Sequence, residues 1–251
     1  MTFIFETEEL KDLTELLSLN FEAPKRAVKQ ISPHVFAIKI NDHTGVAIGH
    51  SLASDLEIEK CLDFLTETTL CYWWIDAIQE NLAARLEKKG FYRNIPVALM
   101  KADLQHMEIS PPLNDIKIKH AETPSEKDVC IDIISTCFGV SKADKQEWIL
   151  YLESNLDSKH CFLYLAYWQD IPAAVSLALH QGNQLILDEV CVLPSFRNKG
   201  LGFAISRHAL EKGSVQGMTT ALLGATDTGG AIYYKLGFKK VGLLQILRFS
   251  Q

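Results

Sequence analysis

The segment between residues 185 and 203 constrains the fold of this chain more than any other. An apolar run from Leu185 to Leu193 stops at Pro194, a basic loop with two glycines follows, and an apolar-periodic stretch opens at Phe203. This order predicts a strand, a turn and the start of a helix. Backbone N–H groups and the positive end of the helix dipole then point at one spot. The segment therefore predicts a binding site for a phosphate or pyrophosphate group.

Two familiar phosphate-binding motifs do not fit this loop. A P-loop needs Gly-x-x-x-x-Gly-Lys-Ser/Thr, which is not found in the sequence. A dinucleotide-binding fingerprint needs a small residue three positions after Gly202, where the chain has Ile205. What remains is the pattern Arg-x-x-Gly-x-Gly at residues 197–202. The structural alternative is a helix N-terminus that happens to carry two glycines.

A second segment, residues 221–238, favours a phosphate-binding loop over a helix start that happens to carry two glycines. A short apolar run and a polar turn precede a short helix, and Gly237 stands where a helix C-cap belongs. Together, in this order, the two segments resemble the GNAT superfamily of acyl-CoA-dependent N-acyltransferases. The acyl-CoA loop of that family reads Gln/Arg-x-x-Gly-x-Gly/Ala, which residues 197–202 match, and a later block often ends Tyr-x-Lys-Leu-Gly-Phe, which residues 233–238 match. The resemblance covers residues 116–249.

The resemblance implies a mixed α/β GNAT fold with a central mixed sheet, and acetyl-CoA as the acyl donor. It also implies which residues hold that coenzyme. The strand residues that would carry the pantetheine arm are Val190, Cys191 and Val192. The loop and helix start that would hold the pyrophosphate comprise Arg197, Asn198, Lys199, Gly200, Leu201, Gly202 and Phe203.

Proton transfer is assigned from the same resemblance. Tyr233 occupies the usual general-acid position of the family, four residues before Gly237; the alternative is an aromatic side chain that only lines the coenzyme channel. Asp188 and Glu189 lie on the strand before the loop and face opposite ways, because side chains alternate along a strand. We expect Glu189 to take the proton of the amine. Either acid could instead bind a cationic substrate or occupy a wet strand position.

Composition limits the other function classes. The net charge of −6 argues against a general nucleic-acid binder. The six cysteines form no Cys-x-x-Cys pair and have no histidine cluster at zinc spacing, so no metal is expected. The acidic start lacks a signal-peptide pattern, and no apolar stretch is long enough to span a bilayer. We therefore expect a soluble, reduced, cytoplasmic protein with no membrane contact.

The chain divides into two expected domains, 1–110 and 111–251, joined at the Pro-rich stretch 110–115. In the second domain we expect helices at 125–138, 142–156 and 203–212, with a further short helix around Tyr233. We expect strands at 116–120, 161–167, 173–180, 185–193, 218–223 and 238–249.

The first domain reads as a degenerate GNAT-like unit arranged in tandem with the second. It has expected strands at 35–40, 44–51, 71–75 and 96–104, and helices at 55–66 and 79–88. It lacks the Arg-x-x-Gly-x-Gly loop, because an acidic helix start with Asp55 and Glu57 stands in that place. The alternative is an unrelated α/β domain.

The leading function is transfer of an acetyl group from acetyl-CoA to a primary amine by direct attack. A non-catalytic acyl-CoA-binding or regulatory module is the alternative, and a partner-binding protein that keeps only the fold is a third possibility. The loop at 197–202 argues against the third. The sequence leaves the amine open, whether small molecule or protein, as well as the acyl length and the oligomeric state.

Overall fold

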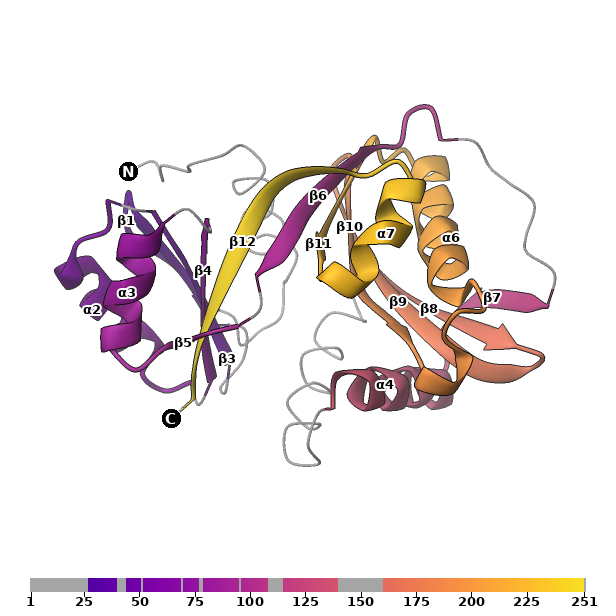
Figure 1. Cartoon of the computed structure of the whole chain (residues 1–251), viewed down its shortest axis with the longest axis horizontal. Coiled ribbons are helices and arrows are strands. Elements are labelled where there is room, and N and C mark those ends of the chain that lie inside the picture. The colour runs from indigo at the N-terminus through magenta and orange to yellow at the C-terminus, as the bar shows by residue number, and fades with distance from the viewer. Residues whose placement is uncertain are drawn as a thin grey trace. The chain divides into compact units, whose positions relative to one another are not determined.

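The computed structural model describes residues 27–39, 44–50, 52–68, 70–76, 79–94, 96–107, 115–139 and 160–250 (Figure 1). By contacts the chain forms two compact units. Unit 1 takes in the described residues up to Leu99 together with Gly224–Asp227 and residues 240–250. Unit 2 takes in the described residues of Met100–Leu223 and Thr228–Lys239. In the first part of the chain the two units meet between Leu99 and Met100; the domains expected at 1–110 and 111–251 stay a prediction.

Unit 2 is built on a mixed sheet in the order β6-β11-β10-β9-β8-β7, where β6 enters the unit with Met100–Asp103. Strands β7 to β10 pair antiparallel, and β10 pairs parallel with β11. The bounds are β6 Val97–Asp103, β7 Ile116–His120, β8 Cys161–Trp168, β9 Ile171–Gln181, β10 Gln184–Val192 and β11 Thr220–Ala225.

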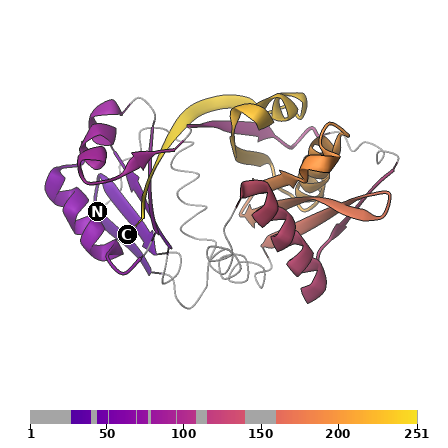
Figure 2. The same cartoon turned by 60° about the horizontal axis from the view of Figure 1, so that its bottom comes forward.

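Three α-helices and one short 3-10 helix belong to the described part of unit 2: α4 Pro124–Phe138, η1 Pro194–Phe196, α6 Leu201–Val215 and α7 Asp227–Lys235. Helix α4 begins at a capping box, in which Thr123 accepts from the Glu126 N–H, and it ends at Gly139 with φ 64°. Figures 1 and 2 show α4 and α6 on opposite sides of strands β8 to β10. Both faces of the central strands are therefore covered, which explains their continuous apolar sequences.

The sheet of unit 1 resembles that of unit 2, because antiparallel strands lead to one parallel pair in both. In unit 1 the strand order is β1-β2-β3-β4-β12, with β5 also paired to β12. Strands β1, β2 and β3 pair antiparallel, β3 pairs parallel with β4, and β12 pairs antiparallel with β4. The bounds are β1 Ala27–Ser32, β2 Val35–Lys39, β3 Thr44–Gly49, β4 Leu70–Asp76, β5 Tyr92–Arg93 and β12 Lys239–Ser250.

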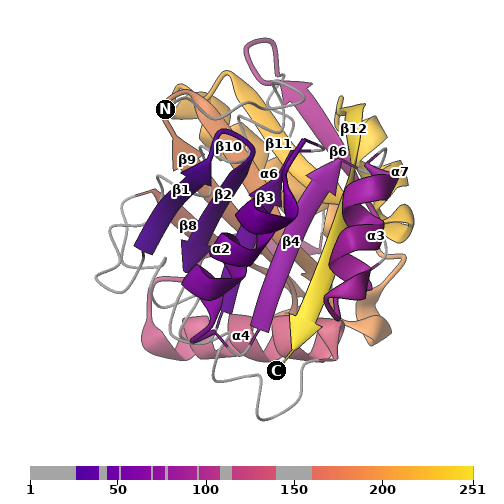
Figure 3. The ribbon, with the colours of Figure 1, turned by 90° about the vertical axis from the view of Figure 1, so that its left-hand side faces the viewer.

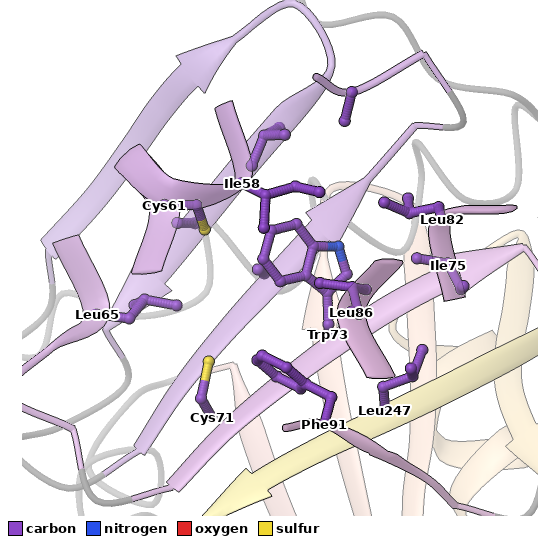
Figure 4. Packing of buried hydrophobic residues seen from close by; sticks show 14 of the residues in the cluster. Ile58, Cys61, Leu65, Cys71, Trp73, Ile75, Leu82, Leu86, Phe91 and Leu247 are labelled. Atoms are coloured by element: carbon purple, nitrogen blue, oxygen red, sulfur yellow. The ribbon is translucent and has the colours of Figure 1, made fainter. Parts of the chain in front are cut away.

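Helices α2 (Asp55–Leu65) and α3 (Glu80–Lys88) cover one face of this sheet, as Figure 3 shows. Between them and the strands lies an apolar core centred on Trp73, which is fully buried (Figure 4). The Phe91 ring meets the Trp73 ring edge-on at 6.1 Å between centroids. Gly49 lies so close that a Cβ there would come within 2.4 Å of Trp73 Nε1. The indole therefore needs a glycine beside it.

Most expected elements are present within a few residues of their predicted bounds. Strand β1 and the short β5 were not predicted. The expected helix at 142–156 and most of the expected linker lie outside the described residues. The main difference concerns two strands: the sequence interpretation gave 96–104 to the first domain and 238–249 to the second, whereas β6 neighbours β11 and β12 pairs with β4. Contacts place most of each strand in the other unit.

Candidate active site

A bulge on β10 sets the backbone of the candidate site. The register with β9 runs to Asp188↔Leu177 and resumes at Cys191↔Val175, so β10 has one residue more than its partner there. Glu189, inside the bulge, has φ 50°, which is uncommon for a residue with a side chain. Such strained positions persist where the surrounding structure holds them, often at functional sites.

Strand β10 also parts from its other neighbour near the bulge. Its parallel pairing with β11 spans Gln184–Ile186 and goes no further along the described strands. Backbone groups of the later residues that face β11 consequently have no ladder partner on that side. Val190, Cys191 and Val192, the residues expected to carry a pantetheine arm, lie in this stretch.

The loop after β10 is a turn with two left-handed residues, Asn198 at φ 62° and Gly200 at φ 80°. Gly200 is the N-cap of α6, and no side chain bonds the first backbone N–H groups of that helix in the described structure. The first helical bond of this end runs from Ala204 N–H to the Gly200 carbonyl oxygen, at 2.9 Å. The N–H groups of Leu201, Gly202 and Phe203 therefore precede it and point out of the helix end. Helix ends of this kind bind anions in other proteins; the turn and helix start are those that the sequence predicted, and their binding of a phosphate stays a prediction.

Gly202 allows close packing behind this loop. A Cβ at Gly202 would lie 3.2 Å from Ile232 Cδ1 on α7 and 3.6 Å from Val192 Cγ2 on β10. The glycine thus lets the helix start, the strand end and α7 approach one another.

The two cations of the loop have contacts within unit 2. Lys199 Nζ lies 5.0 Å from the centroid of the Trp168 ring and 5.9 Å from that of Phe196. Arg197 Nε donates to the Val192 carbonyl oxygen at 3.3 Å. Sequence reasoning did not select Trp168, because it is distant from the loop along the chain and belongs to no motif.

The two acids at the bulge differ in their surroundings. Glu189 is buried, and its Oε2 atom has no hydrogen-bond partner in the described structure. Burial, followed by the nearby charge of Asp188, raises the pKa of Glu189 well above its usual range. Asp188 is exposed and accepts a hydrogen bond from the Glu189 N–H at 2.9 Å. Protein atoms around the Asp188 carboxyl nevertheless displace enough water to raise its pKa. Glu189 therefore holds its proton to higher pH than a free carboxyl does, and Asp188 is the more accessible acid.

Tyr233, on α7, is close enough to Asp188 for the charge of that carboxylate to act on its phenol. Its ring packs against Phe238 at 5.8 Å between centroids and 70° between planes. Burial raises the pKa of Tyr233, and the charges of Asp188 and Cys191 raise it further. The phenol thus keeps its proton throughout the neutral range and can donate it. Gly237, with φ 88°, ends the helix as predicted, and the Phe238 N–H donates to the Tyr233 carbonyl oxygen at 3.0 Å.

The helix start in unit 1 that corresponds to the α6 N-terminus is that of α2, and its first N–H groups are already bonded by side chains. Helix α2 also follows an antiparallel strand and leads into a parallel one, but Ser54 caps it and Glu57 bonds back to the Ser54 N–H at 2.6 Å. Burial acts to raise the pKa of Glu57, but hydrogen bonds from Ser32, Ser54 and His34 outweigh it and lower that pKa to about 2. Asp55 pairs with Arg85 at 2.8 Å. An anionic carboxylate thus occupies the place that an anion would need.

Comparison with known proteins connects this geometry with a family. Residues 158–240 match the family model described as "Acetyltransferase (GNAT) domain". These residues form a GNAT acetyltransferase domain. It includes the β10 bulge, the loop, α6 and Tyr233, and it supports acyl transfer as the general class of reaction. No curated protein matches the chain.

Solved structures share the fold at low sequence identity. A GCN5-related N-acetyltransferase from Kribbella flavida is 16% identical, with 96% of this chain and 93% of that chain covered at a TM-score of 0.70. Another from Sphaerobacter thermophilus is 14% identical, with 86% and 76% covered at 0.63. A tandem GNAT protein from the clavulanic acid biosynthesis pathway is 13% identical, with 93% and 86% covered at 0.59. The expected mixed α/β GNAT fold is confirmed, and at these identities the likeness extends to the fold alone.

No helix in the described ranges is long and apolar enough to cross a membrane. Among the same residues, no group of three or more His, Cys, Asp or Glu side chains is arranged to hold a metal ion.

Proposed function

We propose that the GNAT domain of this chain transfers an acetyl group from acetyl-CoA to a primary amine. The observation that supports this most strongly is the α6 N-terminus, whose outward N–H groups follow a left-handed turn and have no side-chain cap. The diphosphate of coenzyme A carries the negative charge that such an end binds. When bound, the coenzyme supplies an acetyl thioester, which an amine can attack.

The chain's own residues suit this substrate in three places. The loop from Arg197 to Phe203 would hold the diphosphate through backbone N–H groups. The strand residues Val190–Val192 would hold the pantetheine arm through the backbone groups that β11 leaves unpaired. A backbone N–H in this stretch can polarise the thioester carbonyl, and one such donor stabilises a transition state by roughly 3 kcal/mol.

Proton transfer is assigned to the groups at the bulge. Tyr233, which stays protonated, would donate to the departing sulfur. The pair Asp188 and Glu189 would accept the proton of the amine; Glu189 remains our candidate base, and Asp188 is the exposed member that a substrate reaches first. Because the two carboxyls interact, their titration belongs to the pair. Separate Asp188→Asn and Glu189→Gln variants would show which member the reaction needs.

We also propose that unit 1 is a degenerate GNAT-like unit in tandem with unit 2. It repeats the strand-helix-strand order of unit 2, and its corresponding helix start is occupied by the Ser54–Glu57 cap. The likeness to a tandem GNAT protein supports this arrangement. Titration calorimetry should then detect one acetyl-CoA site per chain. A stoichiometry of two would contradict the degenerate reading of unit 1.

Two assays test the function itself. Calorimetry with acetyl-CoA tests binding, and thiol release over a panel of amines and peptides tests transfer. Binding together with thiol release supports the enzyme. Binding without release over the whole panel would favour the alternative, a non-catalytic acyl-CoA-binding or regulatory module, for which the burial of Glu189 is the supporting observation. An absence of binding would contradict both.

A further inference from the structure

The tip of the β8–β9 hairpin lies beyond the end of β10. Strand β10 runs antiparallel to β9, and just after its end the Leu193 N–H donates to the Ala173 carbonyl oxygen at 2.9 Å. The residues of β9 that precede Ala173 therefore extend past the point where β10 stops. Ile171 is the first of them, and it pairs with Trp168, the last residue of β8. Trp168 thus lies further along the direction of β10 than the bulge does.

The ammonium group of Lys199 connects the loop with two aromatic rings. Its Nζ atom lies 5.0 Å from the centroid of the Trp168 ring and 5.9 Å from that of Phe196, the last residue of η1. Both rings are half-buried, and Lys199 is exposed. Each ring therefore presents part of its face to an exposed side chain and not to the packed interior.

Lys199 can leave these rings at little cost. The nearby lysines of β7 have carboxylate partners, since Lys117 pairs with Asp170 at 2.6 Å and Lys119 pairs with Glu126. In the part of the chain that the structure describes, Lys199 Nζ contacts the two rings and pairs with no carboxylate. A cation–π contact at an exposed site changes an equilibrium constant by only about 2- to 5-fold. Exposed side chains also change rotamer within nanoseconds.

The proposed function gives the coenzyme a direction along β10. Its thioester would lie near the bulge, its pantetheine arm along Val190–Val192 and its diphosphate at the α6 N-terminus. The adenosine part is attached to the other side of the diphosphate, so it would continue past the end of β10, toward the tip that carries Trp168. A purine base has a flat π face, on which aromatic side chains stack.

We propose that Trp168, flanked by Phe196, binds the adenine base of the coenzyme by stacking. This inference rests on the proposed acetyl-CoA site and adds the residue that selects an acyl carrier with a nucleotide end. Stacking of one base on an aromatic side chain changes an equilibrium constant by roughly 5- to 100-fold, which exceeds the effect of the Lys199 contact. The base therefore displaces the ammonium of Lys199 from the ring, and the ammonium pairs with a phosphate of the same ligand.

The test compares the binding of two ligands by calorimetry: acetyl-CoA, and acetyl-phosphopantetheine, which lacks the adenosine part. Trp168→Leu should weaken the binding of acetyl-CoA by roughly 5- to 100-fold and leave the binding of acetyl-phosphopantetheine unchanged. Trp168→Phe keeps a ring and should restore most of the loss. Trp74→Leu, which removes a half-buried tryptophan from β4 of unit 1, is the matched control and should change neither affinity.

The pair of ligands separates stacking from a structural role. If Trp168 only supports the fold of the hairpin and loop, Trp168→Leu should weaken the binding of both ligands equally, and that result would overturn the proposal. It would leave the proposed acetyl transfer standing, because the unmodified chain would still bind acetyl-CoA. A failure of the unmodified chain to bind acetyl-CoA would overturn both.

A second measurement observes the ring itself. The chain has four tryptophans, which can be labelled as fluorotryptophan and followed by fluorine NMR. The resonance that is absent from Trp168→Phe identifies Trp168. Adenosine monophosphate should shift this resonance more than those of the other tryptophans, and acetyl-phosphopantetheine should leave it in place. A Trp168 resonance that does not respond to adenosine monophosphate would contradict stacking, whatever the acetyl-transfer assays show.

Discussion

Leu247 on β12 pairs directly with Trp73 on β4, so a strand that follows the GNAT domain in sequence completes the core of unit 1. Both side chains are fully buried in the same apolar cluster (Figure 4). The stability of unit 1 therefore depends on residues that lie more than a hundred positions away along the chain.

Leu247→Ala tests this dependence. The substitution removes buried methyl groups from the centre of the cluster, and such changes cost about 2–5 kcal/mol of unfolding free energy. Urea unfolding followed by tryptophan fluorescence should show that loss. Leu243→Ala, at an exposed position of the same strand, is the matched control and should shift stability by less than about 0.5 kcal/mol. Equal effects of the two changes would show that β12 does not belong to this core.

Gly200→Ala tests the anion-binding turn. Gly200 has φ 80° and Gly217, at the other end of α6, has φ 91°; a Cβ at either position would meet no atom within 4 Å. Both alanine variants should therefore lose about 1–2 kcal/mol of stability from backbone strain alone. Gly200→Ala should in addition weaken acetyl-CoA binding in calorimetry, and Gly217→Ala should not. Equal affinities in the two variants would separate the turn from coenzyme binding.

Tyr233→Phe tests the proposed proton donor. Loss of a general acid lowers turnover by roughly 100- to 10,000-fold, while binding of the coenzyme should change little. The assay is thiol release with an amine that the unmodified chain accepts, alongside calorimetry with acetyl-CoA. Tyr234→Phe, at the exposed neighbouring position, controls for loss of a phenol from the same helix. Unchanged turnover in Tyr233→Phe would remove this residue from the mechanism.

Glu189→Gln should stabilise the fold at high pH. Because the folded-state pKa of Glu189 is raised, the folded chain holds a proton that the unfolded chain has released. Stability is therefore full below the unfolded pKa, about 4.3, and falls as the pH rises through the folded pKa. Melting curves across this range should show a gain for Glu189→Gln that grows with pH. Glu122→Gln, an exposed carboxyl, serves as the control. A pH-independent difference would show that folding does not raise the pKa of this carboxyl.

Much of the site could be predicted because its signals are local. The loop at 197–202 places two glycines and a helix start within a few residues, and the helix that ends at Gly237 has its cap in the adjoining residues. The capping residues Thr123 and Pro124 likewise mark the start of α4. Such patterns depend on neighbours along the chain, so one sequence reveals them.

Other features of the site could not be predicted because they depend on contacts between distant segments. The surroundings of Glu189 depend on the pairing of β10 with β9, where the register shifts, and the contact of Lys199 with Trp168 joins the loop to β8. A window of sequence around Glu189 or Lys199 does not contain these partners. The contacts therefore arise only when β8, β9, β10 and the loop pack together.

The sequence by itself determined where most of the described strands and helices lie, because hydrophobic periodicity and caps are properties of short segments. It also determined the turn before α6, since glycine and a helix start suffice for that geometry. The tertiary structure alone decided which strands pair. Residues 97–103 and 239–250 were recognised as strands, yet β6 joins β11 and β12 joins β4. A strand offers the same backbone donors and acceptors to any neighbour, so its partner is chosen by the packing of side chains such as Leu247 into a distant core.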